Sequence, residues 1–347
     1  MRVDLHNHTE ESSAVVRHWV AQLAGASECY VRAKDSLFQA TRVRGLDAIA
    51  ITNHDAIGDA LALAERHPES VIVGCEYSVA GGDGYLLHVV VLDVTPALHA
   101  TLDRVRAWGL APFCREVKAA GRPYFLAHVA WGTFHERPMT PVVVEEWLQH
   151  FELIETLNST RTRENDLAAK LARYYGKTGV GGSDGHELGS IGRAWTEAPA
   201  ARTPREFLAA MLARDVVAGG EGGGVEHFGR TIRGIALGFY ASEWDRVRDA
   251  GGLVAYAGRA TAGDWVRHGC ELAFAPALPL FAHVGSLRQV EALERDVARL
   301  EAEFTAHLRA RAIRRALDEP DATVAEREAL LARELARIAD AFGTDAP

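Results

Sequence analysis

Histidine and acidic residues occur at several points in the N-terminal part of the chain, each time directly after or inside a short apolar segment. The first group is Asp4-Leu5-His6-Asn7-His8, in which alternation along a strand puts His6 and His8 on the same face. Two imidazoles placed in this way can bind one metal ion. Because the chain has 15 histidines, one H-x-H pair also arises by chance and does not identify a metal site alone.

Further groups repeat this arrangement along the chain. They are Thr52-Asn53-His54-Asp55, Gly74-Cys75-Glu76, His88 in an apolar run, Ala127-His128, and Ser183-Asp184-Gly185-His186. Each has a simple structural explanation when it is taken alone, and a histidine such as His88 is usually a neutral core residue. Together, however, they place His, Asp or Glu where a βα-barrel gathers its active site, at the carboxyl ends of its strands. Imidazole and carboxylate ligands without thiolates favour zinc, manganese or iron.

The elements that must position these residues alternate between apolar strands and amphipathic helices from Arg2 to about Gly219. The expected strands are Val3–Leu5, Asp47–Ile51, Val71–Cys75, Leu86–Leu92, Tyr124–Ala127, Leu153–Leu157 and Gly179–Gly182. The expected helices are Asp35–Arg44, with Asp35 as its N-cap, and Ile57–Arg66, Pro112–Ala120, Pro141–His150 and Glu164–Tyr174. This alternation predicts an α/β fold with parallel strands, in the form of a barrel.

The composition changes after the glycine-rich segment Gly219–Gly224, which is not followed by Lys-Ser/Thr and is therefore no Walker loop. We expect it to provide flexibility or a close backbone approach. Helices are expected beyond it at Thr231–Arg248, Val290–Leu308 and Val324–Phe342. The sequence thus predicts a barrel over residues 1–219 and a C-terminal helical appendage over 220–347. The appendage packs against the barrel or against a second subunit, which makes a homodimer through these helices one candidate assembly.

Charge and cysteine content exclude some classes of protein. The net charge of −9 disfavours nucleic acid as a partner, because coating a phosphate backbone needs basic stripes. The four cysteines lie far apart without a C-x-x-C pair, so neither a disulfide framework nor a thiolate zinc site is expected. With no apolar signal region after Met1 and no transmembrane stretch, the expected location is the cytoplasm, away from membranes.

The ordered set H-x-H, T-x-H-D, G-x-E, a following His, A-H and S-D-x-H resembles the PHP (polymerase and histidinol phosphatase) superfamily over roughly residues 1–200. The resemblance implies a distorted (β/α)7 TIM-like barrel that carries two or three divalent metal ions. It implies a first metal held by His6, His8, Glu76 and Asp184. It implies a second metal that shares Glu76 and adds His88 and His128, and a third held by His54 and His186.

The sequence departs from the family pattern in two places. Where an acid or histidine commonly completes the third metal site, this chain has Ser13 and Ala14. Either Glu10, Glu11 or Asp35 replaces that ligand, or the third site is weak or vacant. Asn53 stands where Asp is frequent, which affects the orientation of ligands more than ligation itself.

By this resemblance the activity is that of a metal-dependent phosphoesterase acting on a small phosphomonoester, such as a sugar, amino-alcohol or nucleotide phosphate. Two cations that share a carboxylate generate hydroxide near neutral pH, and the hydroxide attacks phosphorus. If no third metal is bound, Asp55 and His186 are expected to assist with protonation. Arg193 is the first candidate for a phosphate contact, and Arg161, Arg137 and His135 are weaker ones.

Two other functions are compatible with the same residues. A PHP-like amidohydrolase or C–O hydrolase would use the same metal-activated hydroxide on a carbonyl carbon. A non-catalytic metal-binding scaffold domain would have lost ligands, whereas this chain retains eight of those expected. Metal content separates the scaffold from the enzymes, and phosphate release separates the two enzyme classes.

Overall fold

The computed structural model describes residues 1–12, 29–131, 137–259, 278–320 and 322–343. Its centre is one nine-stranded sheet in the order β7-β6-β5-β4-β3-β2-β1-β8-β9. The strands are β1 (Arg2–Asp4), β2 (Ala48–Ile51), β3 (Val71–Gly82), β4 (Tyr85–Leu92), β5 (Tyr124–Leu126), β6 (Leu153–Asn158), β7 (Thr178–Gly182), β8 (Ala194–Glu197) and β9 (Val217–Gly220). All seven strands expected from the sequence are present, whereas β8 and β9 were not expected.

The expected parallel pairing holds for only part of the sheet, which is mixed. Strands β1 to β3 and β5 to β7 pair in parallel, but β4 runs antiparallel to both β3 and β5, and β8 runs antiparallel to β1 and β9. The reason lies in the turn Gly82-Asp83-Gly84, where all three residues have positive φ. Such a turn returns the chain at once, whereas a parallel neighbour needs a long crossover.

Side-chain hydrogen bonds of Thr196, together with those of Ser183 to Ala194, join the two ends of the sheet into a nearly closed barrel. Thr196 of β8 accepts a hydrogen bond from the Gly181 amide of β7 at 2.8 Å and donates one to the Gly181 carbonyl at 2.9 Å. Because a Cβ at Gly181 would lie 2.4 Å from the Trp195 carbonyl oxygen, only glycine permits this approach. The predicted α/β barrel is therefore confirmed, with β8 as the strand that completes it.

Helices surround the barrel and bury the outward faces of its strands. They are α2 (Ala33–Phe38), η1 (Gln39–Val43), α3 (Gly58–Arg66), α4 (Pro96–Val105), η2 (Arg106–Trp108), α5 (Leu110–Ala119), α6 (Pro141–Leu148), α7 (Arg163–Tyr175) and α8 (Pro204–Ala213). Helices α4 and α8 were not expected from the sequence. The N-cap of α2 is Arg32, and Asp35 lies in the first turn, so the expected Asp35 cap was wrong.

Alternation along the strands separates the barrel interior from the helix-covered surface. In β2, Ala48 and Ala50 join an interior cluster that includes residues of β4 and β7, while Ile49 and Ile51 pack with residues of α2 and α3. The interior cluster also includes Val90 of β4, so His88, two residues earlier, points to the same side. The polar site therefore lies directly above an apolar interior.

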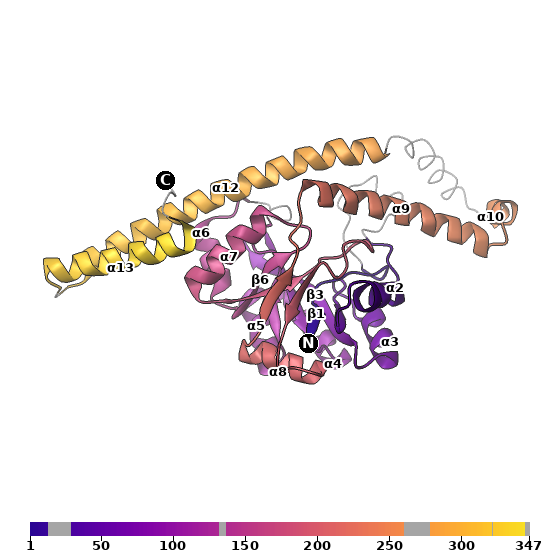
Figure 1. Ribbon diagram of the computed structural model, residues 1–347, viewed down its shortest axis with the longest axis horizontal. Coiled ribbons are helices and arrows are strands. Elements are labelled where there is room, and N and C mark those ends of the chain that lie inside the picture. Colours follow the sequence, from indigo (N-terminus) through magenta and orange to yellow (C-terminus); the bar gives the residue numbers. More distant parts are fainter. Residues whose placement is uncertain (13–28, 132–136, 260–277, 321, 344–347) are drawn as a thin grey trace.

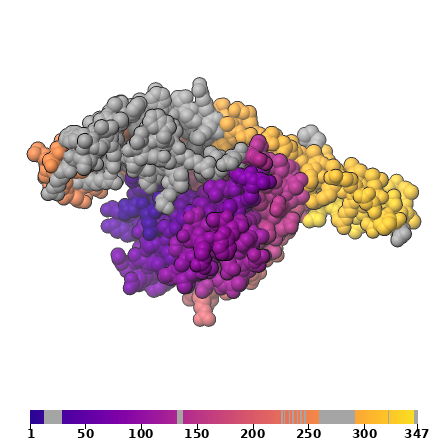
Figure 2. Space-filling model, turned by 180° about the vertical axis from the view of Figure 1, so that it is seen from behind, coloured from indigo at the N-terminus to yellow at the C-terminus, as the bar shows by residue number. Residues whose placement is uncertain are grey.

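The C-terminal region is helical, as expected. It contains α9 (Val225–Asp249), α10 (Leu253–Arg259), α12 (Leu278–Asp318) and α13 (Val324–Phe342). Figure 1 shows α12 crossing the molecule beside α9, with α13 folded back against its far end. The α12–α13 hairpin projects beyond the barrel in both views (Figures 1 and 2). Phe304 and Phe342 join these helices to the core formed with α6 and α7. Among the described helices, none is long and apolar enough to cross a membrane.

We predict that Thr196→Val weakens the fold, because the buried Gly181 amide loses its acceptor while the side-chain shape is kept. A buried donor left unpaired costs about 1–3 kcal/mol, so the free energy of unfolding measured with urea should fall by about that amount. Thr101→Val removes an equivalent hydroxyl from the exposed face of α4 and should change stability by less than about 0.5 kcal/mol. Equal stability of the two variants would contradict the closure described here.

Candidate metal centre

Two backbone bridges bring the predicted site residues together at the carboxyl ends of the strands. Asn7 pairs in parallel with Gly185, which places His6 and His8 beside Asp184 and His186. His54 pairs in the same way with Glu76. The barrel topology thus gathers residues that lie up to 180 positions apart in the sequence, as the strand-end argument predicted.

Glu76 is the hub of the cluster. Its Oε2 lies 3.2 Å from His6 Nε2, 3.2 Å from His8 Nε2 and 3.1 Å from His54 Nδ1. Its Oε1 lies 3.0 Å from His88 Nδ1 and 3.2 Å from His128 Nε2. The carboxylate is buried, and each of its two oxygens faces a different group of imidazoles. This is the geometry expected of a carboxylate that bridges two cations.

Asp184 is the second carboxylate of the cluster. Its Oδ1 lies 3.7 Å from His6 Nε2 and 3.5 Å from His8 Nε2, so these three residues form one possible ligand group. The residue has φ = 50°, a left-handed conformation that Asp tolerates better than most residues. His128, with φ = 27°, also departs from ordinary backbone geometry. Strained backbone of this kind is concentrated at functional sites.

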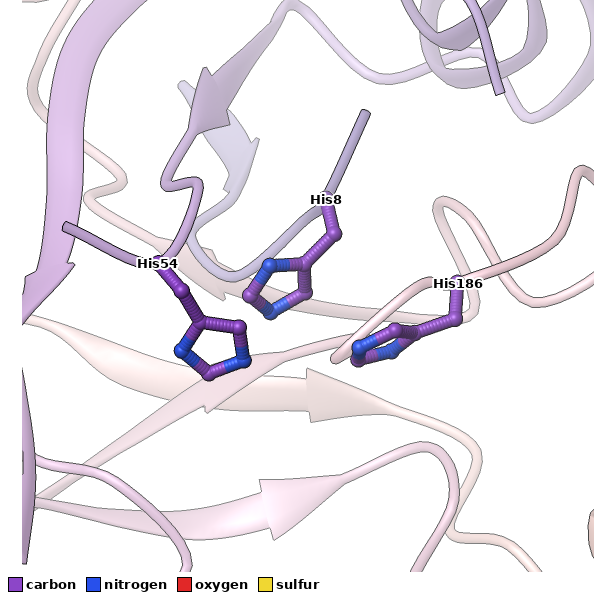
Figure 3. A group of neighbouring side chains, drawn as sticks. All are labelled: His8, His54 and His186. Atoms are coloured by element: carbon purple, nitrogen blue, oxygen red, sulfur yellow. The ribbon is translucent and has the colours of Figure 1, made fainter. Parts of the chain in front are cut away.

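A third group consists of histidines alone. The imidazoles of His8, His54 and His186 come from three different loops and point toward one another (Figure 3). Ring centroids are 4.5 Å apart for His8 and His54 and 4.2 Å apart for His8 and His186. The four potential ligand groups of the described residues all belong to this one cluster, and together they use all eight residues expected to bind metal.

The electrostatics of the cluster favour bound cations. Burial by itself would lower the pKa of His6, but the carboxylates of Glu76, Glu155 and Asp184 outweigh it and raise that pKa well above its usual value. Burial opposes ionisation of Glu76 as well, yet the surrounding histidines hold its pKa well below the usual range. The carboxylates therefore attract positive charge to the centre of the cluster. A divalent cation can replace the proton on His6.

Other ligand histidines are predisposed to the neutral form that binds metal. Burial lowers the pKa of His88 to about 4, and burial together with His186 and His54 lowers the pKa of His8. The described part of the chain gives no hydrogen-bond partner to His6 Nε2, His8 Nε2 or Glu76 Oε2, although all three atoms are buried. Buried polar atoms without partners are costly. The donor set therefore fits divalent cations, and the predicted metal-binding character of the cluster agrees with its geometry.

Sequence reasoning missed the residues that orient the inner histidines. Glu155 of β6 accepts from His6 Nδ1 at 3.0 Å and from the His128 amide at 2.9 Å, and Ser12 Oγ lies 3.1 Å from His8 Nδ1. These contacts leave Nε2 of both imidazoles facing Glu76, which is how outer contacts fix the tautomer of a ligand. An acid within the apolar strand Leu153–Asn158 was the available signal for Glu155.

Asp4 was overlooked for a different reason, because it precedes the H-x-H pair without being a ligand candidate. It is fully buried and accepts from the amides of Ser183 at 2.8 Å and Gly192 at 2.7 Å. Burial raises its pKa to about 6, although these backbone donors act in the opposite direction. Asp4 thereby holds the segment that carries Asp184 and His186 against β1.

The two departures from the family pattern have different outcomes. Asn53 accepts from the Thr9 amide at 2.7 Å and donates to Thr9 Oγ1 at 2.8 Å, a pair of bonds that the acceptor-only Asp carboxylate cannot make. Ser13 and Ala14 lie outside the described residues. Of the proposed substitutes, Glu11 accepts from the Asp59 amide at the start of α3, and Asp35 pairs with Arg32. Among the described residues, neither they nor Glu10 belongs to a ligand group.

The residues expected to assist catalysis lie in different surroundings. The Asp55 carboxylate accepts from the Ser78 amide at 3.0 Å and pairs with Arg106 at 3.2 Å. His186 lies at the edge of the cluster, with its side chain 17% exposed. Arg193 pairs with Glu221 at 2.6 Å. Arg137 is exposed, and His135 lies outside the described residues.

Arg161, a weaker candidate in the sequence, is the arginine whose described contacts reach the cluster. Its Nη2 lies 3.4 Å from Asp184 Oδ2, and its guanidinium lies against the face of the Trp131 ring. The glycine-rich segment Gly219–Gly224 contacts the backbone of Arg161. The Gly223 amide donates to the Arg161 carbonyl at 2.8 Å, and a Cβ at Gly223 would lie 2.5 Å from the Ser159 carbonyl oxygen. The expected close backbone approach is therefore present.

Comparison with known proteins gives one family match and several similar folds. Residues 162–216 match the sequence profile of a family described as PHP-associated, a stretch that contains Asp184 and His186. Among the curated proteins that were compared, none matches the chain.

Solved structures of similar fold show low sequence identity. PsfC from Pseudomonas syringae is 17% identical, with a TM-score of 0.47 over 70% of this chain and 97% of that one. An amidohydrolase from Chromobacterium violaceum, with bound sulfate and no metal, is 18% identical with a TM-score of 0.40 over 60% and 96%. A candidate metal-dependent phosphoesterase from Bifidobacterium adolescentis is 14% identical with a TM-score of 0.38 over 61% and 96%.

We predict that Asp184→Asn lowers the metal content of the purified protein, because it removes one charge from the ligand group. Elemental analysis by mass spectrometry should show the loss of at least one equivalent per chain relative to the unmodified protein. Asp83→Asn, the same substitution in the exposed β3–β4 turn, should leave metal content unchanged. If both variants bind as much metal as the parent, Asp184 is not a ligand.

Chelation should also destabilise the folded protein. A cation that binds only the native state contributes about 2.7 kcal/mol when its free concentration is 100 times its Kd. We therefore expect EDTA to lower the Tm of the protein as isolated, and added Mn²⁺, Zn²⁺ or Fe²⁺ to restore it. The Asp184→Asn variant should show a smaller shift. An unchanged Tm after complete metal removal would contradict a buried metal centre.

Proposed function

We propose that this chain is a metal-dependent phosphoesterase of the PHP superfamily that hydrolyses a small phosphomonoester, a proposal supported by the PHP-associated profile that matches residues 162–216. The metals proposed are two or three ions of manganese, zinc or iron. The ligand sets proposed are those expected from the sequence, with Glu76 shared between the first and second ions. Sugar, amino-alcohol and nucleotide phosphates are the substrate classes that such a centre accepts.

One observation carries this proposal, which is the division of the Glu76 carboxylate between two groups of imidazoles. Oε2 faces His6, His8 and His54, whereas Oε1 faces His88 and His128. When bound, two cations in such a site lower the pKa of a water molecule and stabilise charge on phosphoryl oxygens. A serine or cysteine nucleophile is then unnecessary, and the four cysteines need no catalytic role.

The chain's own residues have three tasks in this proposal. Glu155 and Ser12 hold the His6 and His8 rings so that their Nε2 atoms face the reacting centre. Apolar residues of the barrel interior exclude water from below. If only the first two ions are bound, His186, which is partly exposed, exchanges protons with solvent and protonates the leaving oxygen. We assign this task to His186 before Asp55, because Ser78 and Arg106 already bind the Asp55 carboxylate.

Arg193 is a less favourable phosphate contact than the sequence indicated. Its guanidinium forms an ion pair with the exposed carboxylate of Glu221 rather than with a member of the cluster. A phosphate would have to displace Glu221 before it could bind there. The proposal for the chemical step therefore does not depend on Arg193.

The proposed activity is tested by phosphate release. Metal-free protein is reconstituted with Mn²⁺, Zn²⁺ or Fe²⁺ and assayed with a panel of phosphomonoesters, phosphodiesters, amides and lactones. We expect phosphate release from monoesters, and a loss of more than about 100-fold in His8→Ala, with Asp83→Asn as the unaffected control.

Each other outcome identifies a different function. Stoichiometric metal with hydrolysis of amides or lactones but not of phosphoesters would assign the chain to the C–N or C–O hydrolases. Failure to bind metal under any of these conditions would favour a scaffold domain. Full activity in His8→Ala would refute the ligand assignment even if the parent protein is a phosphatase.

A further inference from the structure

Arg161 is a buried cation whose hydrogen-bonding capacity is only partly used. The residue is 8% exposed and follows β6 by three positions. Nη2 is 3.4 Å from Asp184 Oδ2, but the buried Nε has no hydrogen-bond partner among the described residues. Burying a charged donor without a partner is costly. The unused donor therefore points to a ligand that accepts from it.

The Asp184 carboxylate lies between Arg161 and the histidine pair His6 and His8. Its Oδ1 faces His6 and His8, whereas Oδ2 accepts from Asn158 at 3.3 Å and from Arg161. An anion bound at the inner histidines is thus within a few ångströms of the guanidinium. Arg161 is placed to add positive charge to the same anion rather than to form a separate site.

Trp131 fixes the plane of the Arg161 guanidinium from the other side. Its ring covers the guanidinium, and its centroid lies 5.8 Å from that of His128. Trp131 also lines a pocket with Leu86, His88, Leu126, His128 and Val129. A guanidinium held between a carboxylate and an aromatic face loses little entropy when it binds, because its fork is already oriented.

We propose that Arg161 contacts the phosphoryl group of the substrate and makes the centre selective for phosphomonoesters over phosphodiesters. This inference rests on the proposed function. A monoester dianion has three terminal oxygens, whereas a diester has two and carries a single charge. The additional cationic contact therefore benefits the monoester, and arginine suits it because its planar N–H groups match phosphate oxygens.

Binding of inorganic phosphate tests the contact without relying on turnover. The metal-loaded parent, Arg161→Met, Arg161→Lys and the exposed control Arg115→Met are titrated with phosphate by calorimetry, and metal content is measured in the same samples. We expect phosphate affinity to fall about 10- to 100-fold in Arg161→Met, as the loss of a charge-assisted hydrogen bond predicts. The phosphate affinity of Arg161→Lys, which keeps the positive charge, should lie between those of Arg161→Met and the parent. The affinity of Arg115→Met should match that of the parent.

Kinetics test the selectivity. For 4-nitrophenyl phosphate, kcat/KM should fall about 100-fold in Arg161→Met, whereas for bis(4-nitrophenyl) phosphate it should fall less than about threefold. Equal losses for both esters would overturn the inference. The inference would also be overturned if Arg161→Met bound phosphate as tightly as the parent for each metal-loaded chain. Arg161 would then act only by holding Asp184.

The same titration separates this inference from the proposed function. Phosphate binding that depends on Arg161, in a protein that cleaves no phosphoester with any metal, would refute the phosphoesterase proposal and the claimed selectivity while locating an anion contact. If Arg161→Met hydrolyses monoesters as fast as the parent, the proposed function is supported and the role of Arg161 is refuted.

Discussion

The Glu76 carboxylate and the five imidazoles around it are the interaction on which the rest of the site depends. Glu76, His6, His8, His54 and His88 are buried, and the His128 side chain is 8% exposed. A buried carboxylate is stable only when positive charge or hydrogen bonds compensate it. The imidazoles reach Glu76 from four segments, namely the segment after β1 (His6 and His8), the segment after β2 (His54), β4 (His88) and the segment after β5 (His128), so the cluster also connects these parts of the barrel. Cations at this position would connect fold stability with activity, because the same contacts serve both.

Because the cluster has to keep a defined geometry, several side chains around it hold its members in place. Glu155 fixes His6 and the His128 backbone, Asn53 holds the chain beyond His8, and Asp4 holds the segment that carries Asp184. These side chains act by orientation, which is why each has well-defined partners. The C-terminal helices contribute from farther away. Phe304 and Phe342 extend the core beside α6 and α7, and Lys170 of α7 pairs with Glu301 of α12.

The glycine-rich segment shows how a loop without ligands contributes to a site. Gly223 approaches the backbone at Ser159 and Arg161 so closely that no side chain fits, and its amide binds the Arg161 carbonyl. Arg161 in turn contacts Asp184 and Trp131. A glycine run that carries no phosphate-binding signature is thereby linked, through two backbone contacts, to the edge of the metal centre. Its composition follows from steric need rather than from flexibility alone.

Strand alternation and helical periodicity are local properties, and they were sufficient to predict the strand ends that carry the eight ligand candidates, the barrel class and the helical C-terminal region. The direction of β4, the closure through Thr196 and the identity of the arginine beside the cluster became known from the three-dimensional fold. The orienting roles of Glu155 and Asp4 also became visible only in the folded protein. These features depend on which segments meet in space, and neither residue spacing nor charge reveals that Arg193 pairs with Glu221 while Arg161 reaches Asp184.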